Sequence, residues 1–174
     1  MVSYKNIILI VGLIIFVPSL YASDDGSGPT VGEPTHTLYG RTLGNELYSL
    51  KKDLGRIKVI NFFWIECIPC REEMPELARL EREFTGVKFI SVHTSLFKPT
   101  EEPESVANFI KSLKAAPSNI VLTTSKELGN LFNLTGLPHT IVLDENNIVL
   151  MNVAGYNIKN IQNLEISLKH ITKN

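Results

Sequence analysis

The sequence has little of several features that define special classes of protein. Its 174 residues include two cysteines, which are too few for a disulfide-rich scaffold. The 11 glycines and 9 prolines are too few for a collagen-like or low-complexity chain. There are 17 basic and 18 acidic side chains, and this balance argues against a nucleic-acid binder, which carries a basic excess. Because no repeat or second domain is visible either, the length predicts one globular domain with its own core.

The first 22 residues have the pattern of a targeting segment. Lys5 precedes an apolar run over residues 7–17, and Pro18 and Ala22 follow that run. This order is typical of a secretory signal, with Ala22 as the small residue before the cleavage point. The 16 residues from position 7 to position 22 are fewer than the roughly 20 that cross a bilayer. We therefore expect export to the periplasm or another extracytoplasmic space and cleavage to a soluble form, with an uncleaved N-terminal membrane anchor as the alternative.

The rest of the chain divides into a lead-in and one domain of the α/β class. Residues 23–34 are rich in Asp, Gly, Ser and Pro, which predicts a flexible lead-in, and residues 35–174 are expected to fold. Apolar spacing and turn residues predict short strands at 35–38 and 47–48 around a turn at 40–44, a buried strand at 57–63, a helix at 70–84, a strand at 87–93, a helix at 106–113, a strand at 120–122, a short helix at 125–132, a hairpin of 140–143 and 148–153, and a last helix at 161–171. The strand–helix–strand order of residues 57–93 makes a right-handed parallel crossover.

Both cysteines lie in one motif, Cys67-Ile68-Pro69-Cys70, between the buried strand and the first long helix. A cysteine at a helix N-terminus faces unpaired N–H groups and the positive end of the helix dipole, which favour the thiolate. Pro69 lies in the first turn, where its missing N–H has no cost. Two intervening residues bring the sulfurs within bonding distance. This motif predicts a redox-active dithiol, with Cys67 as the exposed attacking thiolate and Cys70 as the resolving thiol.

An inert disulfide and a metal site are the other uses considered for this pair. Zinc requires four ligands, and the histidines of the chain are scattered. A copper chaperone or redox-silent binding module on the same fold would use Cys67 and Cys70 with either His93 or His139. Related copper carriers use a Cys-x-x-x-Cys spacing, which this chain lacks. We therefore favour the dithiol and expect neither a metal nor a cofactor.

Two segments together resemble a known family. Residues 61–75 read NFFWIECIPCREEMP, and residues 136–140 read GLPHT. They resemble the active-site segments of exported thioredoxin-like reductases of the TlpA/ResA group, and the resemblance covers about residues 35–172. It implies an α/β thioredoxin-like fold, in which helices flank a central mixed β-sheet that carries an N-terminal β extension and a βαβ insertion.

The resemblance also implies roles for individual residues. Cys67 and Cys70 match the redox pair. Pro138 matches a cis-proline that faces the disulfide and presents backbone to an extended substrate, with an ordinary trans turn as the alternative. Glu73 matches an acidic residue that would have a raised pKa and exchange a proton with Cys70, with a solvated helix glutamate as the alternative. Cytoplasmic thioredoxins use an aspartate of the central strand for this task, and the corresponding Asn61 does not titrate.

Two residues depart from the family pattern, and a third shapes the groove. Glu66 stands where the family usually has tryptophan, and a carboxylate beside Cys67 should raise the pKa of that thiol and make the reduction potential more negative. His139 replaces a small hydroxyl residue, and we expect it at a strand edge on the surface, with a place near the sulfurs as the alternative. Leu137 should make the groove for a protein substrate apolar.

The function implied by the resemblance is that of an exported thiol:disulfide oxidoreductase. It would reduce disulfides of client proteins, of the cytochrome c maturation or copper-site assembly type. A membrane electron donor of the DsbD/CcdA type would then re-reduce it. We expect a monomer that acts on proteins and does not bind nucleic acid.

Overall fold

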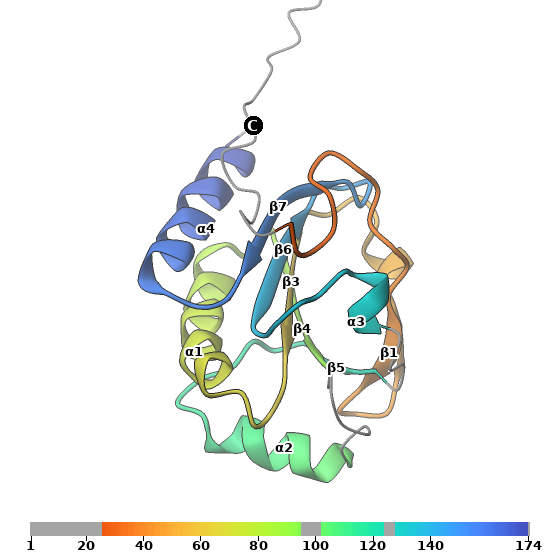
Figure 1. Ribbon diagram of the computed structural model, residues 1–174, viewed down its shortest axis with the longest axis vertical. Coiled ribbons are helices and arrows are strands. Elements are labelled where there is room, and N and C mark those ends of the chain that lie inside the picture. Colours follow the sequence, from red (N-terminus) through yellow and green to blue (C-terminus); the bar gives the residue numbers. More distant parts are fainter. Residues whose placement is uncertain (1–25, 95–101, 124–127, 174) are drawn as a thin grey trace, which may run out of the picture.

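The structure of the protein is a computed structural model that describes residues 26–94, 102–123 and 128–173 (Figure 1). The predicted signal or anchor at residues 1–22 lies outside these ranges, as does part of the predicted short helix at 125–132. Within the described ranges, none of the helices has the length and apolar character needed to cross a membrane.

A mixed sheet of seven strands lies at the centre of the fold. The strands are β1 (Tyr39–Thr42), β2 (Leu47–Ser49), β3 (Lys58–Phe63), β4 (Lys88–His93), β5 (Ile120–Leu122), β6 (His139–Leu143) and β7 (Val149–Ala154). They lie side by side in the order β2-β1-β5-β4-β3-β6-β7. Strands β3, β4 and β5 are parallel, whereas β6 is antiparallel to β3 and β7, and β1 is antiparallel to β5 and β2. The β1–β2 pair is the N-terminal extension that the family resemblance implied.

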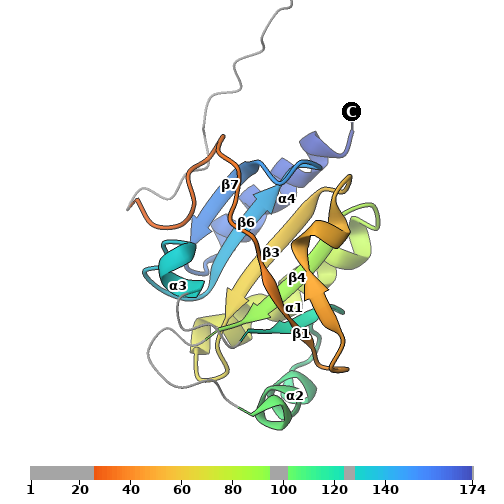
Figure 2. The ribbon, with the colours of Figure 1, turned by 90° about the vertical axis from the view of Figure 1, so that its right-hand side faces the viewer.

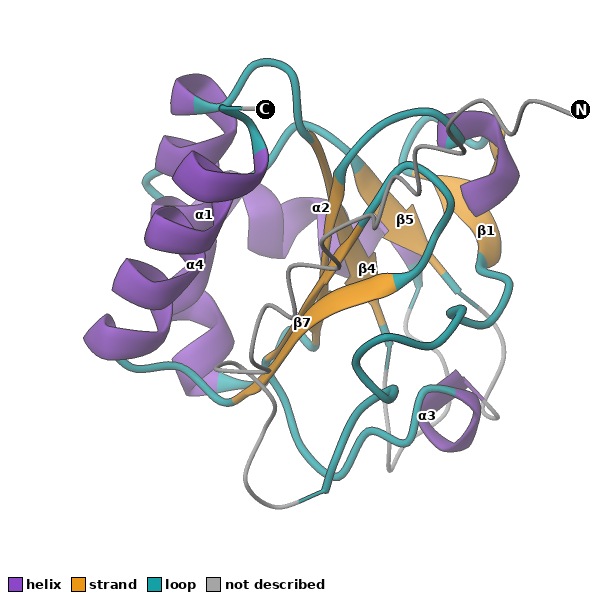
Figure 3. Cartoon of the chain, turned by 90° about the horizontal axis from the view of Figure 1, so that it is seen from above, coloured by secondary structure: helices purple, strands orange, loops and turns teal. Residues whose placement is uncertain are grey.

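Helices cover both faces of this sheet. They are the 3₁₀ turn η1 (Leu50–Asp53) and the helices α1 (Ile68–Glu83), α2 (Pro103–Ser112), α3 (Leu128–Leu131) and α4 (Ile158–Ile171). Helices α1 and α4 lie together on one face and α3 lies on the other (Figures 1 and 3). Helix α2 lies at the end of the sheet where α1 begins (Figure 1). The protein therefore has the thioredoxin-like α/β architecture that the sequence predicted.

The side chains of β3 explain its central position. All six of its residues are buried, because the strand has a neighbour on each side and a covered face above and below. On the face below α1 and α4, Val59 packs in one cluster with Leu77 of α1 and Leu164 of α4. On the opposite face, the rings of Phe62 and Phe132 are 5.0 Å apart. Burial on both faces accounts for the continuous β-branched and aromatic run.

The first strand differs from its predicted position. We expected a strand at 35–38 and a turn at 40–44, whereas β1 spans Tyr39–Thr42 and pairs with both β2 and β5. A side chain at Gly40 would meet the backbone of Leu122 and the side chain of Val121. The glycine that indicated a turn instead allows two strands to approach closely.

The described part of the predicted flexible lead-in packs against the domain. Residues 26–38 cross the α3 face of the sheet (Figure 2). The Gly28 N–H donates to the Asn133 carbonyl at 2.7 Å, and the Gly32 N–H donates to the Val149 carbonyl at 2.8 Å. Residues 26–34, the described part of the predicted lead-in, thus contact this face through hydrogen bonds.

Candidate active site

The turn from β3 into α1 positions the two cysteines. Cys67 is the N-cap residue of α1, and its N–H donates to the Trp64 carbonyl at 3.1 Å. The Cys70 N–H donates to Cys67 Sγ at 3.2 Å, so the first sulfur occupies the position of a helix cap. A disulfide joins the two residues, whose Cα atoms are 5.3 Å apart. Cys67 is half-buried and Cys70 is fully buried, so an incoming molecule meets Cys67 first.

Apolar and exposed residues surround the disulfide. Ile68, between the cysteines, is 71% exposed, and Glu66 is also exposed. Leu137 and Cys67 both pack at the edge of the cluster that contains Cys70. The Leu137–Pro138 peptide bond is cis. The loop before β6 thus brings an apolar side chain and a cis-proline to the same end of the sheet as the cysteines.

Glu73 lies one turn after Cys70, on the buried side of α1, and is 3% exposed. Asn61 Nδ2, from β3, donates to Glu73 Oε2 at 2.6 Å. Thr140 Oγ1, from β6, donates to Glu73 Oε1 at 3.2 Å. Burial between α1 and the sheet contradicts the alternative of a solvated helix glutamate.

The surroundings of Glu73 favour its neutral form. Burial raises the pKa of this carboxyl from 4.5 to about 8, because the charged form is poorly solvated there. Hydrogen bonds from Thr140 and Asn61 act in the opposite direction and lower the pKa, but by less. A carboxyl with a pKa near neutrality can both accept and return a proton under physiological conditions.

His139 corrects one of our expectations. It is fully buried, not at the surface, and its Nε2 lies 2.5 Å from Asn152 Oδ1. Asn152 Nδ2 in turn donates to the backbone carbonyls of Ser27 and Pro29. Because side chains alternate along β6, Thr140 points toward α1 and His139 toward the opposite face. Residues 26–34 cover that face, and the sequence did not predict this cover.

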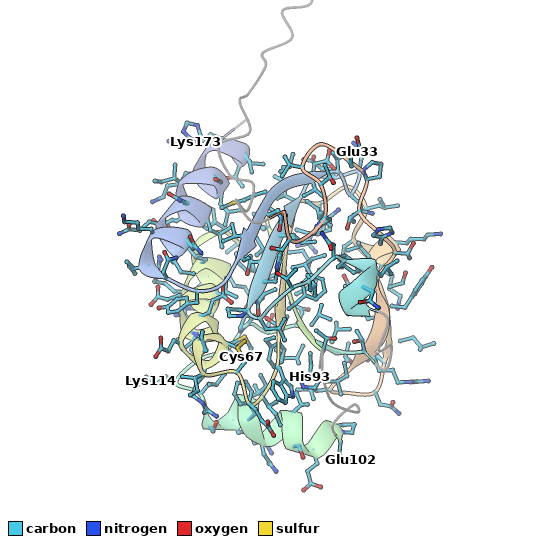
Figure 4. All side chains as sticks on the ribbon, viewed as in Figure 1. Glu33, Cys67, His93, Glu102, Lys114 and Lys173 are labelled. Carbon is cyan, nitrogen blue, oxygen red and sulfur yellow. A yellow bond between two sulfur atoms is a disulfide. The ribbon has the colours of Figure 1, made fainter. Side chains whose placement is uncertain are left out.

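His93, the other histidine considered as a metal ligand, ends β4. It is 2% exposed, and its ring meets the ring of Phe63 edge-on at a centroid distance of 5.4 Å. Cys67 and His93 lie at the same end of the molecule, near α2 (Figure 4). Across residues 26–94, 102–123 and 128–173, no three His, Cys, Asp or Glu side chains are grouped so that they could hold a metal ion.

Two residues of this region, Thr140 and Asn152, were not predicted from the sequence. Thr140 is 67 positions from Glu73, and no local pattern links them. One available signal was that Asn61 and Thr140 face each other across β3 and β6 once the strands are paired. Asn152 lies on β7, two strands from the β3 strand of Asn61, and no sequence pattern indicated its contacts.

A thioredoxin-like sheet with a Cys-x-x-Cys disulfide at the start of its first long helix defines the class of dithiol–disulfide proteins. The comparisons with known proteins agree. The family model described as Thioredoxin-like matches residues 55–149, so the chain belongs to the thioredoxin-like family. Within that family, its relatives place it with the TlpA/ResA-like thiol:disulfide oxidoreductases.

Two curated relatives and one solved structure illustrate the similarity. The thiol:disulfide interchange protein HelX of Rhodobacter capsulatus is 26% identical over 141 residues, which cover 79% of this chain and 76% of HelX. The thiol-disulfide oxidoreductase ResA of Bacillus subtilis is 29% identical over 112 residues, 63% of this chain and 58% of ResA. The chain thus spans less than two thirds of the length of ResA. A crystal structure from Chlorobium tepidum, assigned as a thiol:disulfide interchange protein DsbE, has a TM-score of 0.72 at 16% identity. The superposition covers 81% of this chain and 96% of the Chlorobium tepidum chain.

Proposed function

We propose that this thiol:disulfide oxidoreductase acts as a reductase of protein disulfides outside the cytoplasm, with Cys67 as nucleophile and Cys70 as resolving thiol. The observation that carries the proposal is the asymmetry of the pair. Cys67 is half-buried at the N-terminus of α1, while Cys70 is fully buried one turn further in, next to the Glu73 position. In such an arrangement one sulfur can react with a client, and the other can later resolve the mixed disulfide.

The catalytic cycle begins with the reduced pair. The Cys67 thiolate attacks one sulfur of the client disulfide, which forms a mixed disulfide and releases the other client sulfur as a thiolate. Cys70 then attacks Cys67 Sγ, so the Cys67–Cys70 disulfide forms and the client leaves with both sulfurs reduced. Two electrons pass from the cysteine pair to the client, and a reduced dithiol donor must return them.

Glu73 and Pro138 complete the proposed site. Glu73 accepts the proton of Cys70 when that thiol attacks, and returns it when the pair is reduced again. Pro138 and its neighbour Leu137 line the position at which an extended client segment lies against Cys67. Leu137 is partly buried against the cysteine cluster, which gives this position an apolar wall.

The proposal includes the place of action and the partners. Residues 1–22 serve as a signal or anchor, and residues 35–174 form the catalytic domain. Clients are proteins with disulfides, of the cytochrome c maturation or copper-site assembly type, and a membrane protein of the DsbD/CcdA type supplies electrons. The similarity to HelX, a thiol:disulfide interchange protein, and to ResA, a thiol-disulfide oxidoreductase, supports the chemistry of this proposal.

The proposed function is tested by turnover of a model disulfide. Reduction of insulin by dithiothreitol should accelerate with the wild-type protein and return to the uncatalysed rate with Cys67→Ser. Catalysis by Cys67→Ser equal to the wild type would contradict the proposed nucleophile. Tight copper binding together with an absence of insulin reduction would favour the metal-chaperone alternative.

A further inference from the structure

Two strands supply the side chains that hold Glu73. Asn61 Nδ2 donates to one carboxyl oxygen at 2.6 Å, and Thr140 Oγ1 donates to the other at 3.2 Å. Asn61 Nδ2 also donates to Thr140 Oγ1 at 3.1 Å, so the three side chains form a closed ring of hydrogen bonds. All three are at least 96% buried, with exposures of 1%, 3% and 4% for Asn61, Glu73 and Thr140.

We propose that Asn61 and Thr140 are positioning residues, which hold the Glu73 carboxyl in one place in both of its protonation states and so control its proton exchange with Cys70. The inference rests on the proposed function, because it concerns the proton acceptor of that same site.

The chemistry of the two side chains fits this task. An ionised carboxylate needs donors, and the amide Nδ2 and the hydroxyl Oγ1 provide one for each oxygen. A protonated carboxyl needs an acceptor for its own O–H. Thr140 Oγ1 can accept, and Asn61 Oδ1 is buried with no hydrogen-bond partner in the described part of the chain. Rotation of the hydroxyl or of the amide therefore satisfies Glu73 in either state, which an apolar side chain could not do.

Other titratable groups of the described part of the chain lie in the region of Glu73. Glu72 and Glu76 lie on its own helix α1, and Tyr156 lies in the connection between β7 and α4. Burial first, and then the charges of Glu76, Glu72 and Glu73, raise the pKa of Tyr156, which places that phenol within the field of all three carboxyls. The pKa of Glu73 itself is set by burial and by the bonds from Thr140 and Asn61. Hydrogen bonds from Thr140 and Asn61 thus partly offset the cost of burying a charge at Glu73.

The reaction step that depends on this arrangement is the resolution of the mixed disulfide. The Cys70 S–H transfers its proton to the Glu73 carboxylate, and the thiolate that remains attacks Cys67 Sγ. The Cys67–client bond breaks, the Cys67–Cys70 bond forms, and the client sulfur leaves as a thiolate that takes a proton from water. A carboxylate that is held in place can accept this proton without first rotating into the correct orientation.

The test compares Thr140→Val with the conservative Thr140→Ser and with Ser91→Ala as a matched control. Ser91 is a buried hydroxyl on β4 beside Asn61, and no hydrogen bond joins it to Glu73. The oxidised full-length chain is labelled at the glutamate side-chain carboxyl carbon, and the Glu73 signal, assigned with Glu73→Gln, is followed against pH. Thr140→Val should raise the Glu73 titration midpoint by about one unit, because one donor to the charged form is lost. Thr140→Ser and Ser91→Ala should stay within about 0.3 units of the wild type.

A second variant and a second readout complete the experiment. Asn61→Leu should also raise the midpoint, and it replaces Thr140→Val if that variant does not fold. At pH 7 the resolving step of Thr140→Val should slow about tenfold, and its pH profile should move by the same amount as the midpoint. A midpoint in both Thr140→Val and Asn61→Leu that moves no more than in Ser91→Ala would overturn the inference. If the wild type fails to reduce insulin, the proposed function falls, while the carboxyl titration still decides the positioning role.

Discussion

Glu73 combines a buried carboxyl with a position one turn after a redox cysteine, and this has consequences for stability as well as for catalysis. In the unfolded chain the carboxyl ionises near pH 4.5, whereas burial holds the folded group in its neutral form until about pH 8. Between these values unfolding releases a proton, so unfolding becomes more favourable as the pH rises. The contribution of Glu73 to stability is therefore fully present below about pH 4.5 and is lost as the pH rises through 8.

Glu73→Gln should remove this dependence. The free energy of unfolding of the oxidised wild type should fall between pH 4.5 and 8 by an amount on the order of a few kcal/mol, and the curve of Glu73→Gln should be flatter over this interval. Urea unfolding at a series of pH values measures both curves. The exposed Glu72, replaced in the same way, is the control and should leave the wild-type slope intact. Parallel curves for wild type and Glu73→Gln would contradict the raised pKa of Glu73.

Glu66 is the residue that most clearly separates this chain from the family pattern. It is exposed directly before Cys67, where its charge opposes formation of the thiolate. Because exposed charges interact by about 0.2–1 kcal/mol, Glu66→Gln should make the reduction potential less negative by about 5–20 mV. Equilibration with a glutathione or dithiothreitol buffer measures this shift. Glu72→Gln, further along α1, should leave the potential unchanged, and an equal shift in both variants would refute a specific effect of Glu66.

The segment at residues 26–34 packs against strands β6 and β7. Asn152 of β7 bonds the carbonyls of Ser27 and Pro29 and also contacts His139, the residue directly after Pro138. Gly28 lies between them with a φ of +80°, and a side chain there would overlap both Asn152 and His139. This close approach explains why the position is glycine.

Gly28→Ala should therefore destabilise the domain. We expect it to lower the free energy of unfolding by about 1–3 kcal/mol more than Gly32→Ala, measured by denaturant titration. Gly32 has a similar φ of +89°, but an added side chain would meet no atom within 4 Å. The comparison thus separates the overlap with Asn152 and His139 from the backbone strain that both positions share. Equal losses in the two variants would refute the packing of residues 26–34 against β7.

Features that depend on neighbouring residues could be predicted from the sequence alone, whereas contacts between distant segments could not. The run at 57–63 predicted β3 because a strand buried on both faces needs continuous apolar residues. Cys67 and Cys70 were identified because their motif is local to one turn. His139 was predicted wrongly, since its burial depends on a segment more than 100 positions away that contacts Asn152. The hydrogen bond between Thr140 and Glu73 was not predicted for the same reason. Strand pairing brings the two residues together, and no short sequence pattern indicates this pairing.

The fold and the site together favour thiol–disulfide exchange over metal binding. The sheet places the start of α1, the loop before β6 and the end of β4 at one end of the molecule, so Cys67, Pro138 and His93 share that end. Cys67 is half-buried and Cys70 fully buried, so Cys67 is the sulfur through which we propose that a client binds. A client covalently bound at Cys67 is consequently the most specific product expected of the proposed reaction.

The most direct test is to trap that product in the extracytoplasmic compartment that we propose for this chain. Cys70→Ser removes the resolving thiol, so each attack on a client should stop at the mixed disulfide. We predict that Cys70→Ser accumulates adducts with client proteins. After reduction these adducts should migrate on a gel as the free protein, and mass spectrometry should locate the client at Cys67. Cys67→Ser should accumulate none. An absence of adducts in Cys70→Ser, or equal adducts through Cys70 in Cys67→Ser, would contradict the proposed role of Cys67 as nucleophile.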